Sequence, residues 1–318
     1  MTPLEQAATA ALHAPSVFNT QPWSWRIDGD TMELHADPAR RLEITDRDGR
    51  LLVLSCGAAL HHALTALAAA GWSADVVRRP DPARPSLLAR IRVGAPTVAG
   101  PAVERLASAI PRRRTDRRPF GPRTVTDEEL SRLRLAVEAS GAYLHVVPHD
   151  QVAALAISAE LAGHAELGDR DYRDELRQWT HRPDGSGDGV PADTAVEPGL
   201  RRVPVRDFAP DEPAGLEVGT AHDEGAAYVI LFGRGDDLGD LLRGGEALSA
   251  LLLLATADGL ATAPLSDAVE VEWPRLLVRG LLAGLGEPYL VVRLGYPAEA
   301  EPLPPRPRRQ ATEVIVKH

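Results

Sequence analysis

Lysine is almost absent from this 318-residue sequence. Lys317 is the only one, which leaves 34 arginines among the 35 basic side chains. Schiff-base and pyridoxal-phosphate chemistry, the Walker A phosphate loop and the protein-kinase ATP site all require a positioned lysine amine. We do not expect a lysine at the penultimate position to serve in any of them, so the sequence excludes these enzyme classes.

Cysteine is equally scarce, and Cys56 is the single example. One thiol cannot form an intrachain disulfide, and it cannot supply a cysteine-ligated zinc or iron–sulfur centre. The ten histidines contain no HExxH pattern, so we expect no metal. Cys56 lies in an apolar stretch, residues 51–60, that is typical of a protein core. These features favour a reducing, cytoplasmic location.

Long hydrophobic runs and an excess of positive charge are also missing. The chain has 35 basic and 45 acidic side chains, a formal charge of −10. The longest apolar run, residues 247–257, is interrupted by Ser249 and Thr256 and is too short to span a bilayer. The first residues lack the basic region of a signal peptide. We therefore expect neither a membrane nor a nucleic acid as a partner.

The length predicts either two similar-sized lobes or one large α/β or α+β unit. A long segment, residues 181–220, is rich in Pro, Gly and Asp and has no periodicity, so we predict a loop there, of the kind that often forms lids. Helices are predicted near 3–13, 51–71, 102–110, 126–141, 150–166, 238–258 and 273–284, and strands near 23–27, 31–36, 87–93, 143–147, 227–232 and 289–294.

Two long helices share a residue pattern. A shift of 188 residues lays Gly57 and Gly71 on Gly245 and Gly259, and four Ala or Leu positions between them also match. Any two Ala/Leu-rich helices agree at some positions, so the pattern alone leaves chance open. Each helix is also preceded by a helix-then-strand unit, which favours two related halves.

Two polar segments are candidates for binding a ligand. Residues 112–118 hold five arginines in seven positions, an arrangement that suits a phosphate dianion but is also typical of a solvated charge run. A second cluster, residues 306–309, could close on the same phosphate. Residues 15–23 offer Ser16, Asn19 and Gln21, whose hydroxyl and amide groups suit the edge of a heterocycle; an ordinary turn is the alternative.

Together these segments resemble a known family. Residues 15–23 match the PSxxNxQPW signature of FMN-dependent nitroreductases, and residues 113–118 are similar to their RRSxR motif, with Thr115 in place of serine. The arginine motif here follows the other by about a hundred residues, which reverses the usual order. With the Leu-Ser-Cys-Gly-Ala-Ala-Leu run at 54–60 and Asp-Gly-Val-Pro at 188–191, this order closely resembles the Acg-like branch, in which one chain contains two nitroreductase-like halves.

The resemblance implies an α+β fold with antiparallel or mixed sheets flanked by helices. In this fold residues 1–111 and 112–318 would form the two halves of a pseudo-dimer, with FMN at their junction. It implies one FMN per chain, because residues 138–143 have lost PSxxN and no arginine motif precedes Pro15. Hydride would pass from NAD(P)H to flavin N5 and then to a nitroaromatic, quinone or related acceptor, without a catalytic side chain. The alternatives are an FMN-binding protein with a closed lid and little turnover, and an arginine-rich interaction module.

The resemblance also implies the residues of the site. Arg117 would lie near flavin N1, and residues 259–261 near N5. The lid would be the loop from about 167 to 215, and the chain would be a monomeric pseudo-dimer or a homodimer. The implied cofactor contacts are Pro15, Ser16, Asn19, Gln21, Arg113, Arg114, Thr115, Arg117, Gly259, Leu260, Ala261, Arg308 and Arg309; the implied lid residues are Trp179, Asp188, Gly189 and Val190.

Overall fold

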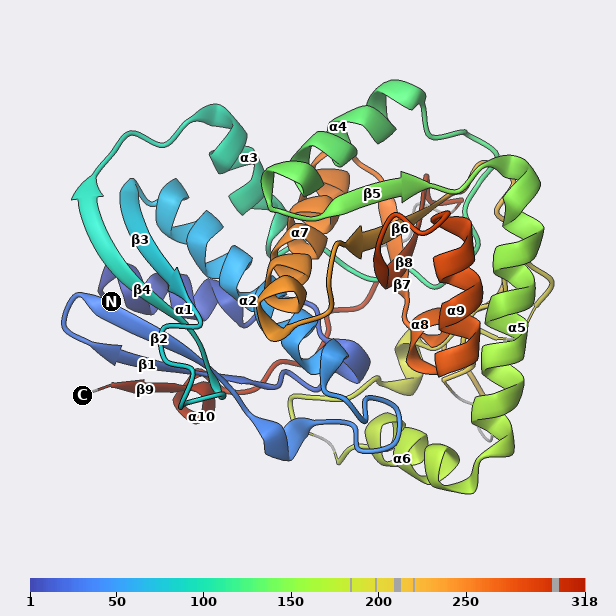
Figure 1. Ribbon diagram of the computed structural model, residues 1–318, viewed down its shortest axis with the longest axis horizontal. Coiled ribbons are helices and arrows are strands. Elements are labelled where there is room, and N and C mark those ends of the chain that lie inside the picture. The colour runs from blue at the N-terminus through green and yellow to red at the C-terminus, as the bar shows by residue number, and fades with distance from the viewer. Residues whose placement is uncertain (184, 198, 209–212, 220, 299–302, 318) are drawn as a thin grey trace.

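Two β-sheets flank a central pair of long helices in the computed structural model (Figure 1). The structure describes residues 1–183, 185–197, 199–208, 213–219, 221–298 and 303–317. The helices at the centre are α2 (Arg50–Ala69) and α7 (Leu238–Ala257), and one hydrophobic core runs from the first sheet through both helices to the second. The predicted α+β class is confirmed.

The first sheet has the order β3-β4-β2-β1-β9. The helix that precedes this sheet in the chain, α1 (Pro3–Ala11), begins where the sequence predicts. The Thr2 hydroxyl accepts a hydrogen bond from the Glu5 backbone amide, and the Glu5 carboxylate accepts one from the Thr2 backbone amide. β9 lies parallel to β1, although it comes from the far end of the sequence. The elements around this sheet are α1 (Pro3–Ala11), β1 (Trp23–Asp28), β2 (Thr31–Ala36), β3 (Trp72–Arg78), β4 (Leu87–Pro96), α3 (Pro101–Ala109), α10 (Ala311–Val314) and β9 (Ile315–Lys317).

The second sheet repeats the topology of the first. Its order, β5-β6-β8-β7, matches β1-β2-β4-β3 strand for strand, and all of these neighbours are antiparallel. In each half a helix precedes the first strand, and a 20-residue helix joins the second strand to the third. The elements are α4 (Asp127–Ala139), β5 (Tyr143–Val146), β6 (Ala227–Gly233), β7 (Ala261–Leu265) and β8 (Glu287–Gly295).

The two central helices cross at a pair of glycines that the 188-residue shift relates to each other. A Cβ on Gly57 would stand 2.8 Å from the Gly245 Cα and would clash with the Leu242 carbonyl. A Cβ on Gly245 would clash in the same way with the carbonyl of Leu54, which the shift lays on Leu242. One turn later the matched pair His61 and Ser249 share a hydrogen bond of 2.8 Å. The contacts at this crossing thus join positions that the 188-residue shift relates to each other.

The second half differs from the first by two helical insertions. β1 and β2 are joined by a tight turn, whereas residues 147–226 separate β5 from β6; a second insertion joins β7 to β8. The insertions contain α5 (Val152–Gly168), α6 (Arg170–Thr180), α8 (Asp267–Glu270) and α9 (Glu272–Leu281). Four short 3-10 turns complete the described elements: η1 (Val17–Asn19), η2 (Pro38–Arg40), η3 (His149–Gln151) and η4 (Ala192–Thr194).

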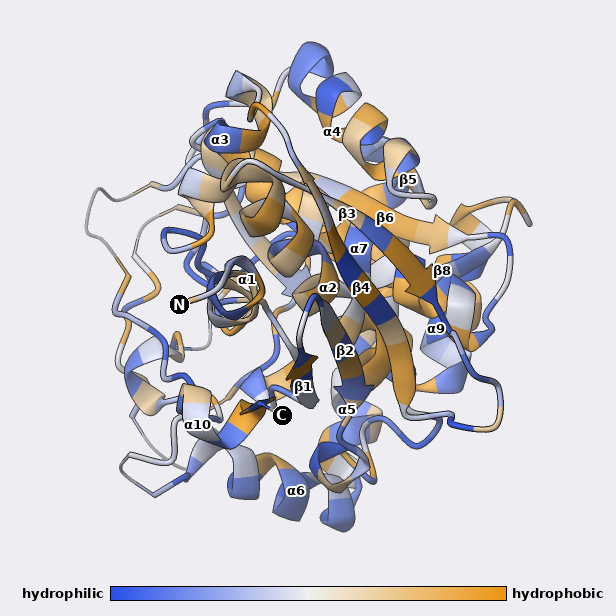
Figure 2. Ribbon diagram, turned by 90° about the vertical axis from the view of Figure 1, so that its left-hand side faces the viewer, coloured by the Kyte–Doolittle hydropathy of each residue, from blue (hydrophilic) through white to orange (hydrophobic). Residues whose placement is uncertain are grey.

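The segment from about 167 to 215 is not wholly a loop, which corrects the prediction. Helix α6 lies within it, because Asp169 caps the helix and Tyr172, Leu176 and Trp179 form one buried stripe among charged residues. Figure 2 shows α6 as a predominantly hydrophilic helix, which explains why its short apolar stripe was overlooked. Residues 184, 198 and 209–212 of the predicted lid lie outside the described residues.

Among the described residues, α2 is the one helix that is long and apolar enough to cross a bilayer. Of its apolar window, 78% is buried inside the protein. Burial of this extent is typical of a core helix.

Candidate functional site

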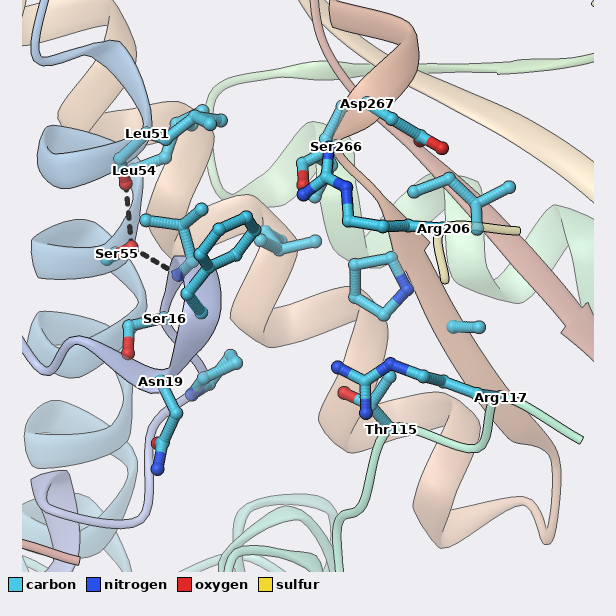
Figure 3. A pocket seen from close by; sticks show the side chains of 18 of the residues that line it. Ser16, Asn19, Leu51, Leu54, Ser55, Thr115, Arg117, Arg206, Ser266 and Asp267 are labelled. Atoms are coloured by element: carbon cyan, nitrogen blue, oxygen red, sulfur yellow. Dashed lines mark hydrogen bonds between the residues drawn. The ribbon is translucent and has the colours of Figure 1, made fainter. Parts of the chain in front are cut away.

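A cavity lies where the two halves meet. It encloses about 850 Å³, including the part that is open to solvent. Figure 3 shows Ser16, Asn19, Leu51, Leu54 and Ser55 on one wall, opposite Thr115, Arg117, Arg206, Ser266 and Asp267 on the other. The remaining lining residues are Pro15, Val17, Phe18, Val205, Phe208, Leu248, Ala263, Pro264, Leu265, Leu290 and Arg306.

The predicted cofactor contacts fall into three groups. Pro15, Ser16, Asn19, Thr115 and Arg117 line the cavity. Residues 259–261 do not line it: they lead into β7, and residues 263–267, slightly further along the chain, form that wall instead. The rest, namely Gln21, Arg113, Arg114, Arg308 and Arg309, belong to the polar clusters described next, beside the cavity.

The turn that begins at Pro15 is strained and firmly held. Phe18, Asn19 and Gln21 all have positive φ, between 46° and 54°, a region that side-chain-bearing residues seldom occupy. The Ser16 hydroxyl accepts a hydrogen bond of 2.9 Å from the Gln21 amide, and the Ser55 hydroxyl on α2 accepts from the Val17 amide. Backbone strain of this kind is characteristic of functional sites, where the surroundings enforce it.

The side-chain amides of Asn19 and Gln21 form hydrogen bonds with other parts of the protein. Asn19 donates to the Pro307 carbonyl at 3.1 Å and accepts from the Arg308 guanidinium at 2.7 Å. Gln21 donates to the Gly187 carbonyl at 2.8 Å and accepts from the Arg309 amide at 3.0 Å. The Asn19 side chain therefore joins the turn to the second arginine cluster, and the Gln21 side chain joins it both to that cluster and to the predicted lid segment.

A buried arginine cluster adjoins the cavity. Arg113 is 1% exposed, and its Nε and Nη1 have no hydrogen-bond partner within the described part of the chain. Burial lowers the pKa of Arg113 well below its ordinary value, and the charges of Arg308 and Arg306 lower it further. Burial also lowers the pKa of Arg306 to about 10 and that of Arg308 to about 9. No carboxylate of the described residues forms a salt bridge with these three guanidiniums.

The other arginines of the motif have different environments. Arg118 forms a salt bridge of 2.9 Å with Asp116, and the fully buried Arg293 donates to the carbonyls of Asp116 and Arg118. Arg112 is exposed and bonds to Ser108. The two hydrogen bonds from Arg293, a residue of β8, thus hold the backbone of the motif in place, while Arg113 lies in the buried arginine cluster.

Arg117 and Phe18 flank an aromatic side chain that sequence reasoning missed. The Arg117 guanidinium lies 4.3 Å from the centre of the Phe208 ring, and the Phe18 ring meets Phe208 edge to face at 5.5 Å. Arg117 also donates to the Thr194 carbonyl at 3.4 Å. Thr194 and Phe208 of the long loop therefore contact side chains that line the cavity.

Arg206, also missed, lies at one end of the cavity. Its Nη2 bonds to Glu270 and, at 3.2 Å, to Glu166. Burial alone would lower the pKa of Arg206, but the charges of these carboxylates outweigh it and raise the pKa. Burial raises the pKa of Glu166 to about 9, with repulsion from Glu270 opposing the attraction of Arg206. The spacing of Arg206, Glu166 and Glu270 in the sequence does not predict this cluster, because only the packing of the fold brings the three residues together.

The predicted lid residues form a clasp beside the turn. Arg182 donates to Asp188 at 2.7 Å, Arg40 donates to its other oxygen, and both guanidiniums lie against the Trp179 ring. Gly189 has φ +79°, and a Cβ there would stand 2.5 Å from the Trp179 carbonyl. Val190 completes the clasp by donating to that carbonyl at 2.9 Å. None of the four lines the cavity, whereas residues 205, 206 and 208 of the same loop do.

The chain is similar to two mycobacterial proteins along nearly its whole length. No family model matches the chain. "Putative NAD(P)H nitroreductase Rv3131" of Mycobacterium tuberculosis is 41% identical over 319 residues, covering 96% of this chain and 89% of that protein. "Putative NAD(P)H nitroreductase acg" of the same species is 36% identical over 315 residues, covering 98% and 95%.

Solved structures resemble the chain more distantly. The FMN-dependent nitroreductase NfnB of Mycobacterium smegmatis, in complex with NADPH, aligns with a TM-score of 0.41 and 15% identity over 67% of this chain and 97% of that one. A nitroreductase with bound FMN from Bacteroides fragilis aligns with a TM-score of 0.37 and 16% identity over 65% and 96%. Because the two mycobacterial relatives match nearly the whole chain, this chain belongs to the nitroreductase family, in the branch that includes Acg.

Proposed function

We propose that the chain binds one FMN in the cavity between its halves and acts as an NAD(P)H-dependent oxidoreductase of the nitroreductase type, at work in the cytoplasm. The observation that carries this proposal is the buried cluster of Arg113, Arg306 and Arg308, in which no guanidinium forms a salt bridge with a carboxylate of the described residues; of the three, only Arg306 is attracted by Asp116 and Asp193, without direct contact. Burying unpaired guanidiniums is costly unless a ligand of opposite charge compensates them.

A phosphate dianion fits this cluster. Two donor atoms of Arg113 are free, and the Nε atoms of Arg114 and Arg308 are also buried without a partner among the described residues. A phosphate monoester offers three acceptor oxygens with geometry that suits guanidinium. We infer that Arg113, Arg306 and Arg308 hold the FMN phosphate, and that Asn19 orients Arg308 through its 2.7 Å hydrogen bond.

The cavity suits the flavin ring. Apolar side chains of α2, α7 and β8 (Leu54, Leu248 and Leu290) form much of its surface, while Ser16, Thr115 and Arg117 supply polar groups. Arg117 would place a cation beside the ring, where it favours negative charge. When bound, FMN supplies hydride chemistry at N5. The protein would bind and orient the cofactor and exclude water from it. This scheme requires no catalytic side chain.

The repeated topology supports the proposal that the chain is a fused pair of halves with one site. Residues 12–22 separate α1 from β1 and form the turn at the cavity. In the second half only residues 140–142 separate α4 from β5, so no corresponding turn is available. A single boundary between residues 111 and 112 does not separate the two sheets, because β9, near the end of the chain, pairs with β1 of the first sheet.

The alternative of a closed, FMN-retaining protein is favoured by one specific feature. Val205, Arg206 and Phe208 of the long insertion line the cavity, and two carboxylates anchor Arg206. If these residues cover the exposed face of the bound flavin, a nicotinamide or an electron acceptor would reach that face only after they move.

Two measurements test these proposals. Flavin released from the purified protein should be FMN at one per chain; a colourless protein, or two flavins per chain, would contradict the site. Anaerobic NADPH or NADH should then bleach the flavin, and a nitroaromatic or quinone should restore its colour. If Phe208 limits access, Phe208→Ala should bleach much faster than wild type, whereas equal rates would exclude Phe208 as the barrier.

A further inference from the structure

A second cavity lies beside the cavity between the halves. It encloses about 1350 Å³, including the part that is open to solvent, and Leu51 lines both cavities. Glu166 and Glu270 line the second cavity, whereas Asp267, at the other end of α8 from Glu270, lines the first. Figure 3 shows Asp267 on the same wall of the first cavity as Arg206. The single turn of α8 therefore reaches from one cavity to the other.

Three carboxyl groups and one guanidinium are buried between the two cavities. The side chains of Glu166 and Glu270 are 5% and 1% exposed, and both bond to the Nη2 atom of Arg206. Asp267 is 5% exposed, and the charges of Arg206 and Glu270 both act on its carboxyl group. One cation thus lies among three acidic groups.

This cluster holds a proton at neutral pH. Ionised carboxylates that share a buried site repel each other, so such a site keeps a proton. Glu166 and Glu270 lie within hydrogen-bonding reach of each other, and Glu270 Oε1 is buried without another donor among the described residues, so a proton held between them supplies the missing donor. Tyr172 and Asp46, which also face the cluster, add no positive charge. Burial accordingly raises the pKa of Glu166 to about 9.

The proposed reaction consumes protons in the first cavity. A quinone that receives a hydride becomes a hydroquinone monoanion, and one proton completes the hydroquinone. A nitro group that receives a hydride and a proton is reduced to a nitroso group and water. If the protein excludes water from the flavin, a positioned acid must provide this proton. Among the described residues that line the first cavity, Asp267 is the one acidic side chain, and burial raises its pKa, which favours the protonated form.

We propose that Asp267, Glu270 and Glu166 form a proton relay from solvent in the second cavity to an electron acceptor in the first. Asp267 gives its proton to an oxygen atom of the acceptor, and the proton held between Glu270 and Glu166 replaces it. Solvent in the second cavity then returns a proton to Glu166, so the cluster is unchanged after each turnover. The relay rests on the proposed function, because it needs an acceptor that is reduced beside the flavin.

Two electron acceptors test the relay. Benzoquinone takes a hydride and a proton, whereas ferricyanide takes electrons alone. After reduction of the holoprotein with dithionite, anaerobic stopped flow measures the rate constants for flavin reoxidation by each acceptor. The ratio of the benzoquinone rate constant to the ferricyanide rate constant should fall at least about tenfold in Glu166→Gln and in Asp267→Asn, because a positioned acid contributes about 10²–10⁴-fold. The matched control is Glu160→Gln: Glu160 is exposed on the same helix, α5, and this variant should keep the wild-type ratio.

Infrared spectroscopy provides a readout that does not depend on turnover. Near neutral pH the oxidised holoprotein should show the carbonyl band of a protonated carboxyl group, which Glu166→Gln should weaken and Glu160→Gln should keep. Thermal unfolding verifies that each variant is folded. Unchanged rate ratios in both relay variants, or a carboxyl band that Glu166→Gln leaves unchanged, overturn the relay while the flavin still turns over. A protein without a reducible flavin overturns the proposed function, and the relay with it.

Discussion

Replacing Arg113 by methionine should change stability and cofactor binding in opposite directions. The guanidinium is 1% exposed, surrounded by other arginines and without a partner for two of its donors in the described residues. In the apoprotein it is an uncompensated buried charge. Replacement of buried ions by apolar groups of similar volume stabilises proteins by about 1–4 kcal/mol. The flavin-free Arg113→Met protein should therefore unfold a few degrees above the flavin-free wild type.

FMN binding should weaken in the same variant. Each hydrogen bond to a charged group contributes about 1.5–3 kcal/mol, and two donors of Arg113 have no partner in the part of the chain that the structure describes. The loss should thus reach at least about 3 kcal/mol, or more than about a hundredfold in Kd. Fluorescence titration of apoprotein with FMN measures this loss, and scanning calorimetry without flavin measures the stability.

A neighbouring arginine provides the matched control. Arg112 is exposed and bonds only to Ser108 among the described residues, so Arg112→Met should change neither quantity appreciably. An Arg113→Met apoprotein that is less stable than wild type, with an FMN affinity within about threefold of it, would show that Arg113 is a structural cation rather than a phosphate ligand.

Three further outcomes follow from the structure. Gly57→Ala should destabilise by about 1–3 kcal/mol because its Cβ would stand 2.8 Å from the Gly245 Cα, whereas Gly163→Ala, a helical glycine with open space around it, should stabilise slightly; equal urea midpoints would contradict the close crossing. Because Glu166 keeps its proton up to a pKa of about 9 in the folded state, its contribution to stability is complete below about pH 4.5 and is lost as the pH rises through 9, so the free energy of unfolding should fall across that window. Glu166→Gln should flatten this profile, and parallel urea profiles would refute the assignment. Burial would raise the pKa of Asp188, but hydrogen bonds from Arg182 and Arg40 hold it below its usual range, so Asp188→Asn should accelerate hydrogen exchange at the Val190 amide; unchanged protection would count against the clasp.

Local signals predicted the elements that local interactions form. The capping boxes at Thr2 and Thr126 fixed the first residues of α1 and α4. The matched glycines indicated two related helices, but that these helices cross at Gly57 and Gly245 was seen only in the structure. Strands β3, β7 and β9 were missed. β3 exposes every second residue at the edge of its sheet, β7 is short and contains Pro264, and β9 exists only because β1 lies beside it.

The candidate site was predictable only where motifs carried it. The two motifs identified Ser16, Asn19, Thr115 and Arg117, and the structure places them around one cavity. Arg306 was visible as part of a charge cluster. Arg206 carried no signal, because its environment depends on carboxylates from α5 and α8 that lie 40 and 64 residues away in the chain.

Strand β9 has a consequence for the chain as it is synthesised. Ile315 pairs with Trp25, so β1 leaves the ribosome 290 residues before its partner strand exists. At the usual 5–20 residues per second this delay is about 15–60 s. During that time the nascent first sheet presents an unpaired edge, the kind of edge on which chains aggregate. Retention of the nascent chain by a chaperone until translation ends would protect this edge.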